Sequence, residues 1–114
     1  MERAGSTARF ALPGQPTMAM LVCETPGRTT KLWRTGGATG PVPLVVTTTG
    51  TRRILDAAPE TAGGTAASLA VNDPLLDAIA FSRGRFMLET PGNPPLYLPS
   101  WPELARVVED CRRR

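Results

Sequence analysis

Two cysteines, Cys23 and Cys111, lie near opposite ends of this 114-residue chain. A disulfide between them would close almost the whole chain into one covalent loop, which is how small exported domains are often stabilised. We expect both positions to be buried, so two buried free thiols are the alternative. Their placement at the two ends favours the bridge, which would stabilise a loop this long by about 4–5 kcal/mol in the chain-entropy model.

A chain of this length forms one domain, because it is too short for two hydrophobic cores. We expect residues 1–7, which are small and polar, to be a disordered N-terminus, and residues 8–114 to form a single β-rich domain. The 12 prolines and 11 glycines are spread along the chain. This distribution predicts many short elements joined by turns.

Seven or eight short segments have the composition or alternation of β-strands. The strongest signal is at 44–49, where every residue after Leu44 is β-branched. Glu-Thr-Pro-Gly occurs at both 24–27 and 89–92, and Pro followed by Gly predicts a turn at each. The expected strands are residues 9–12, 17–23, 29–34, 44–49, 51–55, 66–71, 85–89 and 96–98.

Two helices are expected. Asp73 as the N-cap and Pro74 at the first helical position begin a short middle helix, which ends before Gly84. The second helix spans residues 100–112: Ser100 and Glu103 have the spacing of a capping box, and the apolar residues that follow share one face. That buried face consists of Leu104, Val107, Val108 and Cys111.

These elements predict an α+β domain. The expected architecture is a small antiparallel β-sandwich or partly closed barrel, with the short middle helix and the C-terminal helix packed on the sheet.

The chain has no histidine, which excludes Ser-His-Asp and Cys-His catalysis and every histidine metal site. Neither cysteine has a histidine to activate it as a nucleophile. Two cysteines alone cannot form a structural zinc site. We therefore expect no catalytic residues, no metal site, no cofactor and no enzymatic activity.

Four arginines form a candidate anion site. Arg52 and Arg53 follow a run of threonines, and Arg83 and Arg85 flank Gly84, where guanidinium and backbone N–H groups could converge on an anion. The favoured alternatives are an exposed hairpin with solubilising charge and a helix end that leads into a strand. The net charge is only +3 and is scattered, so nucleic-acid binding is not expected.

A candidate surface for a protein partner surrounds the second turn. Asn93 lies in a stiff loop, 91–95, and Tyr97 and Trp101 follow closely; tyrosine and tryptophan are frequent at binding hot spots. The favoured alternative is that Tyr97 and Trp101 cover the edge of the core.

One stretch resembles part of a known protein group. The segments SRGRF (82–86), LYLPSWPE (96–103) and EDCR (109–112), with Asp73–Ala78 before them, are similar to the C-terminal half of small uncharacterised exported bacterial proteins. The resemblance covers about 40 residues and implies a periplasmic location and a disulfide, but no activity. A second, more general similarity is to periplasmic lysozyme inhibitors, whose inhibitory motif is not visible in this chain.

The compartment signals differ. Residues 1–7 lack the apolar segment of a signal peptide, so the chain as printed predicts a cytoplasmic protein, whereas the cysteine pair predicts export. No segment is long and apolar enough to span a membrane. We expect a mature or truncated form, or a start codon placed too late, and a periplasmic or secreted protein.

The expected function is that of a small non-enzymatic exported domain that binds a protein or associates with the envelope. The alternatives are an anion or nucleic-acid binding protein that uses the arginines, and a periplasmic inhibitor of a lytic enzyme. The sequence predicts no oligomeric state.

Overall fold

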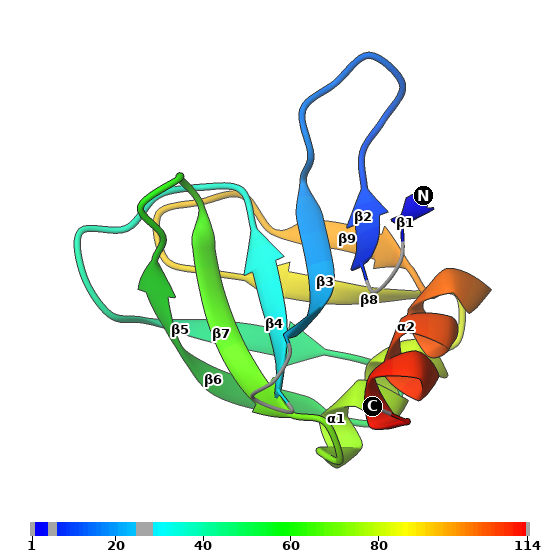
Figure 1. The fold of residues 1–114 in the computed structure, drawn as a ribbon. Helices are drawn as coiled ribbons and strands as arrows, with labels where there is room; N and C mark the ends of the chain where they lie inside the picture. The colour runs from blue at the N-terminus through cyan, green and yellow to red at the C-terminus, as the bar shows by residue number, and fades with distance from the viewer. Residues whose placement is uncertain (1, 5–6, 25–28, 114) are drawn as a thin grey trace.

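The computed structural model describes residues 2–4, 7–24 and 29–113. In these residues the chain forms nine strands and two helices (Figure 1). Their bounds are β1 (Glu2–Ala4), β2 (Thr7–Phe10), β3 (Ala19–Glu24), β4 (Thr29–Arg34), β5 (Val42–Thr47), β6 (Arg52–Pro59), β7 (Thr65–Ala70), α1 (Pro74–Ala80), β8 (Arg85–Glu89), β9 (Leu96–Pro99) and α2 (Pro102–Arg112).

All strand pairs are antiparallel, and the strand order is β1-β2-β3-β4-β7-β6-β5-β8-β9. The strands form two layers that cross in Figure 1: the first layer is β1, β2, β3, β4 and β7, and the second is β6, β5, β8 and β9. β6 joins the layers, because it pairs with β5 over 52–57 but with β7 only at 58–59. The predicted antiparallel, partly closed barrel is therefore confirmed.

The core lies between the layers, where alternate residues of each strand point inward. Leu21, Leu32, Leu44 and Leu88 are among the side chains that are almost completely buried there. Both helices lie at one end of the layers, and α2 packs on α1, β2 and β3 (Figure 1). The predicted apolar face of α2 is buried: Leu104, Val107, Val108 and Cys111.

The two helix starts differ in how well the sequence predicts them. Asp73 is the N-cap of α1, as predicted: its carboxylate accepts a hydrogen bond from the Leu75 N–H at 2.9 Å. The expected capping box before α2 does not form. The N–H of Ser100 donates to the Gly84 carbonyl and prolongs the β8–β9 pairing. The helix therefore begins later, at Pro102, with Trp101 as a cap whose side chain makes no cap hydrogen bond.

The expected turns and terminus lie partly outside the described residues. Most of the turn at 24–27 is not described, whereas at 89–92 Gly92 has φ +78° and the Asn93 N–H donates to the Thr90 carbonyl at 3.3 Å. Residues 1, 5 and 6 of the expected disordered terminus are also outside the description. In the described part of this terminus, Glu2–Ala4 pairs with Thr7–Arg9.

Candidate functional site

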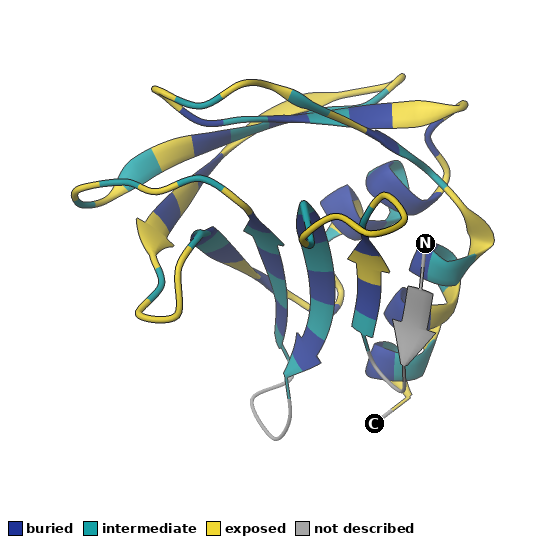
Figure 2. Ribbon diagram, turned by 90° about the horizontal axis from the view of Figure 1, so that it is seen from above, coloured by how far each residue is buried: buried dark blue, intermediate teal, exposed yellow. Residues whose placement is uncertain are grey.

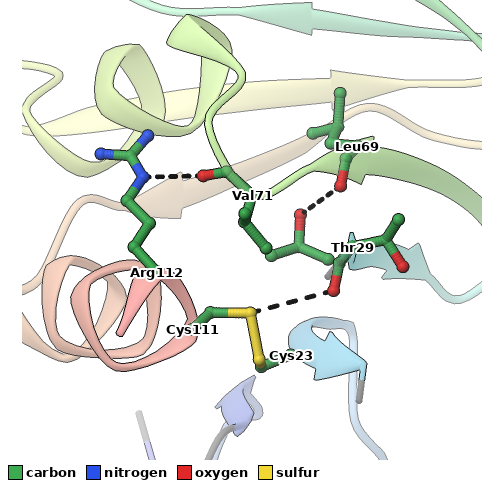
Figure 3. Close-up of a disulfide and its surroundings, with 7 residues drawn as sticks. Cys23, Thr29, Leu69, Val71, Cys111 and Arg112 are labelled. Atoms are coloured by element: carbon green, nitrogen blue, oxygen red, sulfur yellow. Dashed lines mark hydrogen bonds between the residues drawn. A yellow bond between two sulfur atoms is a disulfide. The ribbon is translucent and has the colours of Figure 1, made fainter. Parts of the chain in front are cut away.

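A disulfide joins Cys23 of β3 to Cys111 of α2, as predicted (Figure 3). The Cα atoms are 5.5 Å apart in space and 88 residues apart in sequence. Both cysteines are buried and pack against Val71, which directly follows β7. The bridge thus fastens the C-terminal helix to the first layer.

Arg112 of α2 makes a second set of contacts that hold this helix in place. Its Nε donates to the Val71 carbonyl at 2.7 Å (Figure 3), and its two terminal nitrogens donate to the two oxygens of Asp77 on α1, each at 2.9 Å. Arg112 therefore ties α2 to both α1 and β7. The sequence gives no local signal of this contact, because Asp77 lies 35 residues away from Arg112.

We expect Arg112→Met to lower the free energy of unfolding by about 1–2 kcal/mol, since hydrogen bonds to charged groups contribute about that much. The matched control is Arg113→Met. Arg113 is 76% exposed and lies 4.0 Å from Glu109, so its loss should cost less than about 0.5 kcal/mol. Urea denaturation of both variants measures the difference. Equal costs would contradict the anchoring role of Arg112.

Acid should weaken the domain through two aspartates. Arg112 lowers the pKa of Asp77, and Arg53, together with the Leu75 N–H, lowers the pKa of Asp73. A carboxylate with a lowered pKa in the folded state stabilises the fold above its unfolded pKa of about 3.9, and this contribution is lost as the pH falls through the folded pKa.

We therefore expect the free energy of unfolding to fall as the pH drops below about 4. The decrease should be smaller in Asp77→Asn, which cannot gain that proton. Urea denaturation across the acid range provides the measurement, with Glu109→Gln as a control whose carboxylate is exposed. Identical acid profiles for wild type and Asp77→Asn would refute this prediction.

A buried arginine, missed by the sequence analysis, connects the layers. Arg34 at the end of β4 is 1% exposed, and its guanidinium donates to three carbonyls: Thr35 at 2.7 Å, Leu88 at 3.2 Å and Pro94 at 2.9 Å. Burial lowers its pKa. The strand alternation could have revealed it, because Arg34 shares the inward face of β4 with Thr30 and Leu32.

The four arginines of the candidate anion site differ in the contacts that they make. Arg53 is occupied: both oxygens of Asp73 accept hydrogen bonds from its guanidinium, one of them at 2.7 Å. Among the described residues, no carboxylate pairs with Arg52, Arg83 or Arg85. Arg85 instead lies over the ring of Tyr97, 5.5 Å from its centroid.

The three residues of the candidate partner surface differ in their contacts and exposure. Asn93 has a structural position, since its side-chain amide donates to the Gly37 carbonyl and to Thr90 Oγ1, both at 3.2 Å. Trp101 precedes α2 and is 46% exposed. Tyr97 points outward from β9 and is 59% exposed, so most of its side chain does not pack on the core.

Four apolar side chains point outward from the second layer, and we call them the outer strip: Tyr97, Met87, Val45 and Ile54. The register places Tyr97 beside Met87, and Val45 between Ile54 and Glu89. Thr47 lies beside Met87, so Thr47 and Glu89 lie among the apolar residues of the strip. Ile54 is 58% exposed. No helix or strand among the described elements covers this face in Figure 2. The sequence could not reveal the strip, because β5 and β8 are far apart in the chain.

The surface also has a shallow groove of about 490 Å³ where β6 diverges from β7. Four of its nine lining residues are alanines, and the lining also includes Asp56, Ser68 and the ion pair between Lys31 and Glu60, which is 2.9 Å long. In the part of the chain that is described, no three potential ligands lie together as a metal would require, and no helix is long and apolar enough to cross a membrane.

Comparison with protein-family models, with curated proteins and with solved structures finds no match to this chain.

Proposed function

We propose that this chain is a small non-enzymatic exported bacterial domain that binds another protein through the outer strip. The observation that carries the proposal is an uncovered sheet face with Tyr97 and Ile54 more than half exposed. Apolar side chains gathered on one exposed face are typical of protein interaction surfaces. Tyrosine, in particular, supplies contact area at low entropic cost.

The disulfide supports export. Disulfides persist in oxidising compartments and are rare in the reducing cytoplasm, and the Cys23–Cys111 bridge is buried inside this domain. The absence of histidine from the sequence supports a non-enzymatic role, since most general acid–base chemistry near neutral pH uses that residue.

A photo-crosslinking amino acid at position 97 tests the proposal in the producing cells. We expect it to capture one defined protein, because Tyr97 lies in the outer strip. The same amino acid at Ser68, an exposed position on β7 in the first layer, is the matched control and should not capture that protein. No capture from position 97, or equal capture from both positions, would overturn the proposal.

Tyr97→Ala provides the quantitative test. We expect the affinity for the captured protein to fall by about tenfold or more, as at binding hot spots, while the free energy of unfolding changes by less than about 1 kcal/mol. Titration calorimetry and urea denaturation measure the two effects. If lost stability accounts for all of the lost binding, Tyr97 has only a structural role.

A further inference from the structure

The basic side chains of the described residues differ in whether they pair with a carboxylate; the exposed Arg106 of α2 has no such pair, and neither have three arginines near the outer strip. In the described residues, Lys31, Arg53, Arg112 and Arg113 each pair with a carboxylate, and Arg34 donates to backbone carbonyls. Arg52, Arg83 and Arg85 pair with none of the described carboxylates. All three are exposed, so their donors are available to an external acceptor.

The fold gathers these three arginines although they are scattered in the sequence. Thr47 of β5 is the register partner of Arg52 on one side and of Met87 on the other, which places Arg52 two strands away from the strand that carries Arg85. Arg83 adjoins the same end of the sheet, because its N–H donates to Thr49 Oγ1 at 3.3 Å.

Ser82 fixes this arrangement. The residue is 7% exposed, and its hydroxyl accepts a hydrogen bond from the Thr49 N–H at 3.1 Å and donates to the Arg85 carbonyl at 2.9 Å. The loop that carries Arg83 and Arg85 is thus fastened to the β5–β6 turn. A fixed backbone reduces the entropy that the arginines would lose on binding.

We infer that the end of the outer strip formed by Arg52, Arg83 and Arg85, which we call the arginine end, recognises carboxylates on an acidic segment of the partner protein. This inference rests on the proposed function and names the chemistry of the partner. Guanidinium groups bind carboxylates through paired N–H donors, and arginine is enriched at protein interfaces.

The charges elsewhere on the face favour an acidic protein over a nucleic acid. Glu89 lies beside Val45 within the strip, and Asp56 follows Ile54 on the same face, so the face becomes negative away from Arg52 and Arg85. An evenly charged phosphate backbone would meet repulsion there. A protein segment with carboxylates at one end and apolar side chains beyond them matches both the arginine end and the strip.

Two synthetic peptides test the inference. One carries a run of glutamates followed by alternating leucine and serine, and the other replaces each glutamate by glutamine. We expect the acidic peptide to bind at least about fivefold more tightly, and to lose this advantage as salt rises, because exposed charges are screened. Fluorescence anisotropy gives the affinities, and backbone amide NMR shifts should locate the contact on β5, β8 and β9.

Variants assign the contact to the arginines. Replacing Arg52, Arg83 and Arg85 together by glutamine should weaken binding of the acidic peptide by roughly tenfold and leave the neutral peptide unchanged. Arg85→Gln alone should weaken it by about threefold. Arg106→Gln is the matched control: Arg106 is exposed on α2, away from the strip, and its replacement should change the affinity by less than about twofold.

Three results would overturn the inference: no detectable binding of the acidic peptide, equal binding of the neutral one, or tighter binding of a single-stranded oligonucleotide that depends on the same arginines. None of these results affects the crosslinking test at position 97, which tests the proposed function separately. A protein captured at position 97 whose binding is unaffected by the triple arginine variant would refute the acidic contact and leave the proposed function standing.

Discussion

Breaking the Cys23–Cys111 disulfide should lower the free energy of unfolding by about 4–5 kcal/mol. The bridge spans 88 residues, and a cross-link over so long a loop greatly restricts the unfolded chain in the chain-entropy model. Domains of this size are stable by only about 5–15 kcal/mol in total, so the reduced protein should be close to unfolding at physiological temperature. Urea denaturation of oxidised and reduced protein measures the difference.

The double variant Cys23→Ala/Cys111→Ala separates the bridge from the packing of its sulfur atoms. It should match the reduced wild type in stability and should not respond to reductant. Cys111→Ser is less informative, because burying its hydroxyl group costs about 1–3 kcal/mol by itself. Free alkylation of both thiols in protein isolated without reductant, or equal stability of the oxidised and reduced forms, would refute the prediction.

Much of the fold could be predicted because its signals are local. The strands predicted at 29–34 and 85–89 match β4 and β8, since alternating side chains and flanking turn residues define both segments. Asp73 and Pro74 likewise identify the start of α1. The start of α2 was placed two residues early, because the capping-box spacing at Ser100 competes with pairing of its N–H to Gly84, which is distant in sequence.

The pairing of strands could not be predicted in the same way. β4 lies beside β7 and β5 lies beside β8, and neither pair is consecutive in the chain. The outer strip exists because of the second of these pairings, which brings Val45 to the same face as Met87 and Tyr97. Tyr97 was selected as a candidate from its residue type, whereas its neighbours could be identified only from the register.

The contacts of the arginines could not be predicted from the sequence either. Arg52 and Arg53 are adjacent and looked equivalent, yet Arg53 pairs with Asp73 whereas Arg52 faces outward beside Thr47. Only the fold distinguishes an arginine already bound by the domain from one available to a partner. Arg34 could have been recognised from its alternation with Leu32, but the three carbonyls that hold it lie in parts of the chain that come together only in the folded domain.

Arg34→Met should lower the free energy of unfolding by about 3–4 kcal/mol. Methionine fills similar space but donates no hydrogen bond, so the carbonyls of Leu88 and Pro94 would lose their contacts with the guanidinium. A buried acceptor without a partner costs about 1–3 kcal/mol, and the relief of a buried charge offsets part of the sum. Urea denaturation measures the change, and amide hydrogen exchange should increase most in β4, β8 and the loop 90–95.

Two further variants make this result specific to the three-way contact. Arg52→Met is the same substitution at an exposed position and should change stability by less than about 0.5 kcal/mol. Arg34→Lys retains the charge but offers one nitrogen in place of a planar fork, and so cannot reach carbonyls on both sides of the barrel. It should therefore be nearly as destabilising as Arg34→Met. Wild-type stability in Arg34→Lys would show that charge alone, rather than the geometry of the guanidinium, joins β4 to β8.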